Sequence, residues 1–369
     1  MMTAVIAWPA VARRGEPMTS QSAKPRAPAQ SPFEGRAAAL RVALGQAPKA
    51  SRPLADAIRG VTRSHFTRHV EPLVRRHAPS LMLTPFMDKL RIGACDLYAV
   101  APYLALVCGD RAPAPLRATL TAADWLPLDD DVFARLAGRL VTLIGHHVLQ
   151  RAQRQIARVA AFVVVVDHAL DHGMAEAPRA RGRRLKAILR GTEAPDSELL
   201  ALSHALVAAL RDDAEGSQRQ VLEAALGHID AWIDAEVRAL SGEQDASGLC
   251  HRRAGVEGTI EGLLFPVEGW AGPAVRAWLT GVSMFVQMAD DLLDIEHDLR
   301  DGRMTPATEG RWTIHEVEAA WHETVAGLHA LARRSVPGAR RFSDRVTGAY
   351  RVMMVELVGA MIARPEDGC

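Results

Sequence analysis

The stretch QMADDLLDIEHDLRDGR, Gln287–Arg303, places four aspartates within nine residues. Asp290, Asp294 and Asp298 recur every four residues, so on an α-helix each turns by only ~40° and rises by ~6 Å from the one before. Their carboxylates form a row along one side, with Asp291 rotated by ~100°. Like charges at this spacing destabilise an isolated helix by ~0.2–0.5 kcal/mol per pair, and the negative end of the helix dipole adds to that cost. The row therefore predicts a bound cation, and carboxylate oxygens suit Mg²⁺.

The helix that carries this row has recognisable ends. Pro273 occupies a typical first helical position, and Gly302 follows the last turn. We expect one helix between them, buried along most of its length and charged only at its C-terminal end. Its core stripe consists of Val275, Trp278, Val282, Phe285, Ala289 and Leu293. The face that leads up to the aspartates, which we expect to line a pocket, consists of Leu279, Ser283 and Val286.

A second acidic pair ends another apolar run, FVVVVDHALDHG, in residues 162–173. Asp167 and Asp171 are again four residues apart, with Ala160 and Val163 below them on the same face and Phe162 swung aside. If the two acid-bearing helices run parallel, or point at one cavity mouth, the acids of both face each other across a gap. If the helices are antiparallel, the acids are separated. The first arrangement suits a hydrocarbon that carries a diphosphate.

The chain as a whole predicts an all-α fold in one domain. Its 369 residues are 49% apolar, which suffices for a large core, and no alternating strand pattern of useful length occurs. Residues 1–34 are rich in Pro, Ala, Ser and Arg and are expected to form a disordered tail, with Met18 as an alternative start. Residues 35–365 are expected to form roughly ten helices. Clusters of Pro, Gly and Asp predict breaks at 109–115, 127–131, 173–178, 191–196, 241–248 and 302–310.

Composition excludes several classes of function. A formal net charge of +1 argues against a dedicated nucleic-acid binder. The apolar run at 160–166 is far shorter than the ~20 residues that a membrane-spanning helix needs, so no transmembrane segment is expected. The four cysteines show no metal-binding or disulfide spacing, which favours a reducing cytoplasm.

These motifs resemble those of the class I isoprenoid synthases, the superfamily of trans-prenyl synthases, squalene/phytoene synthases and type I terpene cyclases. Q-x-x-D-D-x-x-D at Gln287–Asp294 is similar to the second aspartate-rich motif of prenyl synthases, and DLRDGRMTP at Asp298–Pro306 resembles the segment after it. Asp167-x-x-x-Asp171 resembles the first motif in its squalene/phytoene-synthase form. AGVEGTIEGLLF at Ala254–Phe265 looks like the small-residue helix before the second motif in that branch.

The resemblance implies a helical bundle of the isoprenoid synthase type with extra N-terminal helices, since the first motif lies late in the chain. It also implies a prenyl diphosphate substrate and three Mg²⁺ ions, with Mn²⁺ as the alternative metal, and it allows a homodimer. The metal ligands would be Asp167, Asp171, Asp290, Asp291, Asp294 and Asp298. The diphosphate would be bound by Arg300, Arg303, Arg179, Arg181 and Arg351. Phe265 would join the pocket residues Ala160, Phe162, Val163, Leu279, Ser283 and Val286.

Two departures from the family pattern narrow the reaction. The Gly-Gly-Lys-x-x-Arg element with which prenyl synthases bind isopentenyl diphosphate is missing, and the first motif starts with Asp167-His168 rather than two aspartates. We therefore expect a type I terpene synthase that ionises a prenyl diphosphate and cyclises or quenches the cation.

Several alternatives stay open. One is a prenyltransferase that joins two prenyl units, and another is a non-catalytic isoprenoid-binding relative. An HD-type metal phosphohydrolase is more distant, because the chain offers only His297-Asp298 as its His-Asp pair. His168 and His172, four residues apart, could instead bind a transition metal.

Overall fold

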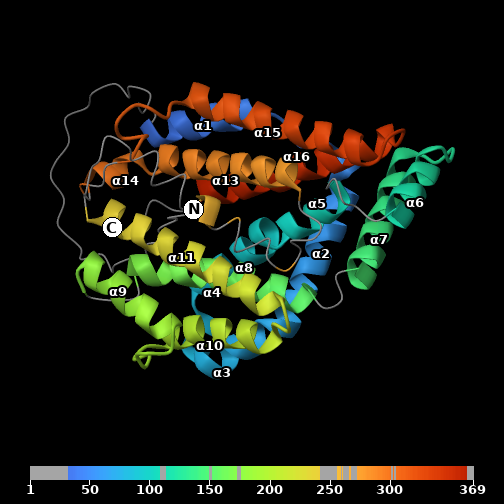
Figure 1. Cartoon of the computed structure of the whole chain (residues 1–369). Helices are drawn as coiled ribbons and strands as arrows, with labels where there is room; N and C mark the ends of the chain where they lie inside the picture. Colours follow the sequence, from blue (N-terminus) through green and yellow to red (C-terminus); the bar gives the residue numbers. More distant parts are fainter. Residues whose placement is uncertain are drawn as a thin grey trace, which may run out of the picture.

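A computed structural model gives the structure of the chain (Figure 1). It describes residues 32–108, 114–148, 152–172, 176–241, 256–258, 260, 266, 272–300, 302 and 305–363. Every regular element in these ranges is helical, which confirms the all-α fold class. The expected tail at residues 1–31 lies outside the described residues. Helix α1 begins at Pro32, so residues 32–34, expected in the tail, are helical instead; Pro at the first turn and the acidic Glu34 both favour a helix start there.

The described residues contain fifteen α-helices, more than the roughly ten expected. Some of the additional boundaries are bends without an intervening loop, and others are short connections, such as 214–217 and 336–339, that no predicted break marked. Helices α2 and α3 meet at Val70, just before Pro72, and α13 and α14 meet at Asp294. The helices are α1 (Pro32–Leu44), α2 (Arg52–His69), α3 (Glu71–His77), α4 (Pro85–Arg91), α5 (Val100–Cys108), α6 (Ala114–Asp124), α7 (Asp130–Val148), α8 (Ala152–His172), α9 (Pro178–Leu189), α10 (Glu198–Asp213), α11 (Gln218–Leu240), α13 (Pro273–Leu293), α14 (Ile295–Arg300), α15 (Ile314–Ser335) and α16 (Arg340–Ile362). Two 3-10 helices, η1 (Lys49–Ser51) and η2 (Pro79–Leu83), and one π-helix, η3 (Ile92–Tyr98), complete the set.

Four of the six predicted breaks, at 109–115, 173–178, 241–248 and 302–310, fall partly on residues outside the description. At each break, the described helix ends lie in or within a few residues of the predicted range. For example, α6 ends at Asp124 and α7 begins at Asp130, while α8 ends at His172 and α9 begins at Pro178. Asp130 and Pro178 are both typical of a first helical turn, where an acid or a missing N–H group costs nothing. These residue types therefore marked the two helix starts, whereas the connections at 214–217 and 336–339 lie at no predicted break.

Helix α8 lies inside the molecule. From Val159 to Asp167 every side chain is buried, and Ala160, Val163 and Val166 have no exposed surface. The helix packs against α2, α10, η3 and α4, with further contacts to α9 and α11. Since each fully buried valine or leucine contributes ~1.5–3 kcal/mol, this helix anchors the bundle around it.

Helix α13 begins at Pro273, and all six residues of its predicted core stripe are buried. The stripe faces α15 and α16, where Trp278 packs edge-on against Tyr350 and donates a hydrogen bond from Nε1 to the Thr324 carbonyl at 2.8 Å. The Tyr350 hydroxyl donates to Thr324 Oγ1 at 3.0 Å. The prediction of one helix up to Gly302 was wrong, because α13 ends at Leu293 and the chain bends at Asp294 before α14.

Across the described helices, no apolar run reaches the length that a membrane crossing needs.

Two glycines of α16 offer a matched test of its packing. A Cβ at Gly348 would lie 2.7 Å from Ser51 Cβ and closer still to Ser51 Oγ, whereas a Cβ at Gly359 would meet nothing within 4 Å. Gly348→Ala should therefore destabilise the protein by about 1–3 kcal/mol through overpacking against η1. Gly359→Ala should be neutral or stabilise it by up to about 1 kcal/mol, because alanine favours the helix. Urea denaturation measures both, and equal effects of the two substitutions would contradict the packing of α16 on η1.

Candidate functional site

The two acid-bearing helices point toward the same side of the molecule. In Figure 1, α14, which follows α13, and α9, which follows α8, both lie at the left of the view, so both acid-bearing helices run in that direction. The C-terminal ends of α8 and α13, where the acids lie, are therefore on the same side. The sequence left open whether the two helices run parallel or antiparallel, and this direction corresponds to the parallel arrangement.

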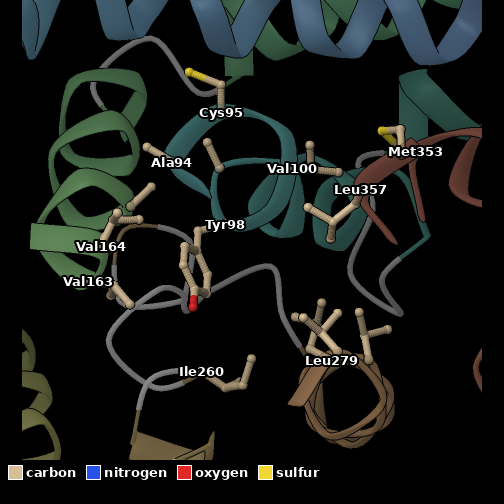
Figure 2. Close-up of a cluster of buried hydrophobic side chains, with 14 of the residues drawn as sticks. Ala94, Cys95, Tyr98, Val100, Val163, Val164, Ile260, Leu279, Met353 and Leu357 are labelled. Atoms are coloured by element: carbon tan, nitrogen blue, oxygen red, sulfur yellow. The ribbon is translucent and has the colours of Figure 1, made fainter. Parts of the chain in front are cut away.

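The helix faces below the acids contribute to one apolar cluster. Figure 2 shows Val163 of α8 and Leu279 of α13 in the same group of buried side chains, together with Ile260 and Leu357 of α16. Tyr98, the last residue of η3, extends its ring into the space between them. The cluster therefore brings together the two faces that the sequence predicted to lie under the two acidic motifs.

The π-helix η3 comes close to α8 because it carries a glycine at the contact. A Cβ at Gly93 would lie 2.8 Å from Val164 Cγ2, which is too close for a larger residue. Asp96 holds the same turn to α2, since it accepts hydrogen bonds from Arg63 Nε at 3.2 Å and from a terminal Arg63 nitrogen at 2.7 Å. This ion pair raises the pKa of Arg63. Together these contacts fix the position of Tyr98 in the cluster.

The aspartate row extends over the bend between α13 and α14. The backbone N–H of Asp294 donates to the carbonyl of Asp290 at 3.0 Å, and the N–H of Asp298 donates to the carbonyl of Asp294 at 2.9 Å. Asp290 is 2% exposed, Asp298 is 5% exposed and Asp294 is partly buried. Asp291 is also buried and accepts a hydrogen bond from Gln287 Nε2 at 2.6 Å. The row is thus a buried feature rather than a solvated helix end.

Asp167 of α8 forms an ion pair with Lys89 of α4, with 3.7 Å between Lys89 Nζ and Asp167 Oδ2. Both side chains are more than nine-tenths buried. One turn earlier on α4, Phe86 stacks on His168, with ring centroids 4.3 Å apart. Sequence reasoning missed Lys89; the available signal was that it is one of only four lysines in an arginine-rich chain, in a segment with apolar neighbours.

The predicted arginines lie in different surroundings. Arg181 donates to the Leu170 carbonyl in the last turn of α8 and to the Glu176 carbonyl at 3.2 Å, so its guanidinium lies beside the end of α8. Arg179 and Arg300 are exposed, on the first turn of α9 and at the end of α14. Arg351 instead donates to the Gln46 carbonyl at 3.3 Å, just after the C-terminal end of α1.

Arg351 lies near the end of α1 that is opposite to the end next to α14. Arg36, near the other end of this 13-residue helix, forms an ion pair with Glu296 of α14. A helix of this length is ~20 Å long, so α1 separates Arg351 from α14. The structure does not bring Arg351 to the row, and Arg36 is a cation next to α14 that the sequence did not single out.

The remaining site predictions are buried or lie outside the described residues. Ala160, Phe162, Val163, Leu279 and Val286 are buried, and Ser283 is partly buried. Asp171 lies in the last turn of α8, but its side chain is outside the description. Arg303 and Phe265 also lie outside the described residues. Of the segment Ala254–Phe265, which resembles the small-residue helix, only residues 256–258 and 260 are described.

Within the described side chains, no group of three or more His, Cys, Asp or Glu is arranged so that it could hold a metal ion. The described acids of α8, α13 and α14 thus do not form a preassembled metal cluster. Their chemistry nevertheless fits Mg²⁺, because a hard cation takes carboxylate oxygens. His168, the described member of the His168/His172 pair, contributes to the stack on Phe86.

Thiol chemistry is excluded at the two described cysteines. Cys95 and Cys108 are buried, and burial raises the pKa of each thiol to about 12. Both therefore stay protonated near neutral pH, and a thiolate is the reactive form of cysteine.

Comparison with family models, curated proteins and solved structures finds no match for this chain. The isoprenoid-synthase type of bundle therefore stays a prediction from the sequence motifs.

The Lys89–Asp167 pair can be tested by a double-substitution cycle. Lys89→Met and Asp167→Asn should each destabilise the protein by about 3–5 kcal/mol, because each leaves the partner charge buried without its counter-ion. The double variant should lose less than the sum of the two, with a coupling energy of about 0.5–3 kcal/mol in urea denaturation.

The matched control is Asp88→Asn, next to Lys89 in the chain but exposed and paired with Arg91 at the surface. It should change stability by at most about 1 kcal/mol. Strictly additive losses for Lys89→Met and Asp167→Asn would contradict a direct interaction between the two charges.

Proposed function

We propose that the protein is a type I terpene synthase, which ionises a prenyl diphosphate with the help of Mg²⁺ and cyclises or quenches the resulting cation. One observation carries the proposal. Helices α8 and α13 run toward the same side, each carries a buried aspartate near its C-terminal end, and Val163 and Leu279 belong to one apolar cluster (Figure 2). A diphosphate-tailed hydrocarbon needs this combination of an acidic, metal-binding entrance and an apolar interior.

The aspartates are the residues that would hold the metal. These are Asp167 and Asp171 on α8 and Asp290, Asp294 and Asp298 on α13 and α14, with Asp291 held by Gln287 beside the row. Mg²⁺ held by these carboxylates would neutralise the diphosphate and would stabilise negative charge on the leaving group. A hard divalent cation takes carboxylate oxygens as ligands, and these side chains would supply them.

Cations next to the acids would bind the remaining phosphate oxygens. Lys89 lies against Asp167, and Arg181 is held at the end of α8 by its bonds to backbone carbonyls. Arg300 is exposed at the end of α14. An arginine binds two phosphate oxygens at once, whereas a lysine acts as a point charge, so these side chains would orient the leaving group.

The apolar cluster would keep water from the allylic cation. Val163, Leu279, Ile260 and Leu357 offer no nucleophile, so a cation between them is protected from hydrolysis. Tyr98 is the aromatic side chain labelled in this cluster, and its ring face could stabilise a passing positive charge. Trp278 and Phe285 instead pack α13 against α15 and α16. Trp278 contacts Tyr350, and Phe285 contacts Trp321.

A prenyltransferase that joins two prenyl units is the second candidate. Lys89 favours it, because a buried lysine beside the first acidic motif could bind a second diphosphate even though the Gly-Gly-Lys-x-x-Arg element is missing. The two candidates differ in the carbon number of the product, since a terpene synthase conserves the skeleton size and a prenyltransferase increases it.

The purified protein should convert at least one prenyl diphosphate of ten, fifteen, twenty or twenty-five carbons, with Mg²⁺, into a hydrocarbon or alcohol of the same carbon number. Gas chromatography–mass spectrometry detects the product, with and without isopentenyl diphosphate. Asp290→Asn and Asp294→Asn should each lower the rate by about 100-fold or more, because each removes a charge that stabilises the departing diphosphate through the metal. Circular dichroism checks that the helical content is kept.

Asp88→Asn serves as the control, because this exposed acid is adjacent to Lys89 but forms its ion pair with Arg91. It should leave the rate unchanged within about twofold. A product with more carbons than its substrate would favour the prenyltransferase. No conversion of any substrate with Mg²⁺ or Mn²⁺, or full activity of Asp290→Asn and Asp294→Asn, would rule out the proposed site.

A further inference from the structure

A groove runs along the contact between α13 and α15. Figure 1 shows α15 at the top of the bundle, with α13 below it. The two helices pack antiparallel, because Trp278 of α13 donates to Thr324 of α15, whereas Phe285, later on α13, packs against Trp321, earlier on α15. The groove between them has a volume of about 660 Å³.

The α13 side of this groove is apolar. Among the described residues that line it, none on α13 is charged; they are Ala274, Ala277, Trp278, Gly281, Met284 and Met288. Ala277 is exposed, and Gly281 and Met284 are only partly buried. The solvent-facing side of a surface helix normally carries charged and polar residues. An uncharged side over about four turns is typical of a surface that contacts another molecule.

The α15 side of the groove carries an acid toward one end and a base toward the other. Gly327 and Ala330 lie between them, with Glu323 about one turn before and Arg334 about one turn after. Both charged side chains are exposed. Glu323 forms no ion pair with any side chain that the structure describes. Gly327 leaves room for the groove floor, since a Cβ there would lie 3.1 Å from Trp278 Cδ1.

This arrangement of charge is complementary to itself. Glu323 and Arg334 are about three helical turns apart, so they lie on nearly the same side of α15, about 16 Å apart along its axis. Suppose that a second α15 lies antiparallel on the first, with a two-fold axis midway between Gly327 and Ala330. Glu323 of one chain then faces the partner's Arg334, and the same pair forms again at the other end. Gly327 faces the partner's Ala330, so the helices can approach to roughly 8–10 Å.

Arg334 does not need to be unpaired for this contact. It already interacts within its own chain. A guanidinium group carries five N–H donors, so a carboxylate from a second chain can bind beside an existing contact. Glu323 is the group that gains a counter-charge.

We propose that the groove between α13 and α15 is a two-fold interface between copies of this chain. A second copy meets both requirements of the groove, because it covers the apolar α13 side and presents one cation and one acid at the required spacing. An unrelated partner would need that same charge pattern by coincidence, whereas two-fold symmetry supplies it. The proposal rests on this groove and does not depend on the terpene synthase activity.

Sedimentation equilibrium of the full chain over a concentration series tests the interface. The wild-type chain should sediment at twice the mass of one chain. Ala330→Arg places a long charged side chain in the middle of the contact and should raise the dimer dissociation constant at least about tenfold. Leu83→Arg is the matched control, because Leu83 is 95% exposed on η2, outside the groove, and should leave that constant unchanged. Circular dichroism checks that each variant keeps its helical content.

Exchanging the two charges tests how the copies are paired. Glu323→Arg and Arg334→Glu should each weaken the dimer at least about tenfold, because each brings like charges together across the axis. An equimolar mixture of the two variants should regain the dimer, since a mixed pair again has opposite charges at both ends. A wild-type monomer would overturn the proposal and leave the groove to a different partner. Equal dissociation constants for Ala330→Arg and Leu83→Arg, or no recovery in the mixture, would also overturn it.

Discussion

Burial of α8 on all sides is the constraint on which the rest of the structure depends. Between Val159 and Asp167 this helix has no solvent-facing side, so α2, α4, η3 and α10 must all pack around it. A helix in that position cannot carry charge along its length without a partner for each charge. Acids are therefore confined to its C-terminal end, and Asp167 there is balanced by Lys89 from α4. The position of the first acidic motif follows from the packing of the core.

Helix α13 also carries buried acids near its C-terminal end, but its two sides differ. Its core stripe packs against α15 and α16 through Trp278 and Phe285, while Leu279 belongs to the apolar cluster. The chain bends at Asp294, and i to i+4 backbone hydrogen bonds join Asp294 to Asp290 before the bend and Asp298 to Asp294 after it. Each helix carries a buried aspartate near its C-terminal end, Asp167 on α8 and Asp290 on α13, and both ends lie on the same side of the molecule. That arrangement is the physical basis of the proposed function.

The sequence was informative where a signal is local and limited where it depends on packing. Long apolar runs ended by Pro or Gly predicted α8, the start of α13 and breaks such as the one at 191–196, because helix ends are set by nearby residues. The bend at Asp294 had no such signal, since the four-residue spacing continues through it. Lys89 was missed because its meeting with Asp167 depends on how α4 and the π-helical turn η3 pack on α8. Arg351 was assigned to the site from its place on an apolar helix, whereas packing directs it to Gln46.

The central claim is that α8 and α13 build one metal-diphosphate site together. The most direct measurement is Mn²⁺ binding, followed by electron paramagnetic resonance, in the presence of a non-hydrolysable prenyl diphosphate analogue. Asp167→Asn and Asp290→Asn should each weaken Mn²⁺ binding, and the double variant should lose much less than the sum of the two losses, because residues of one site are not additive. Additive losses would mean two independent sites, and unchanged Mn²⁺ binding in both single variants would contradict the account altogether.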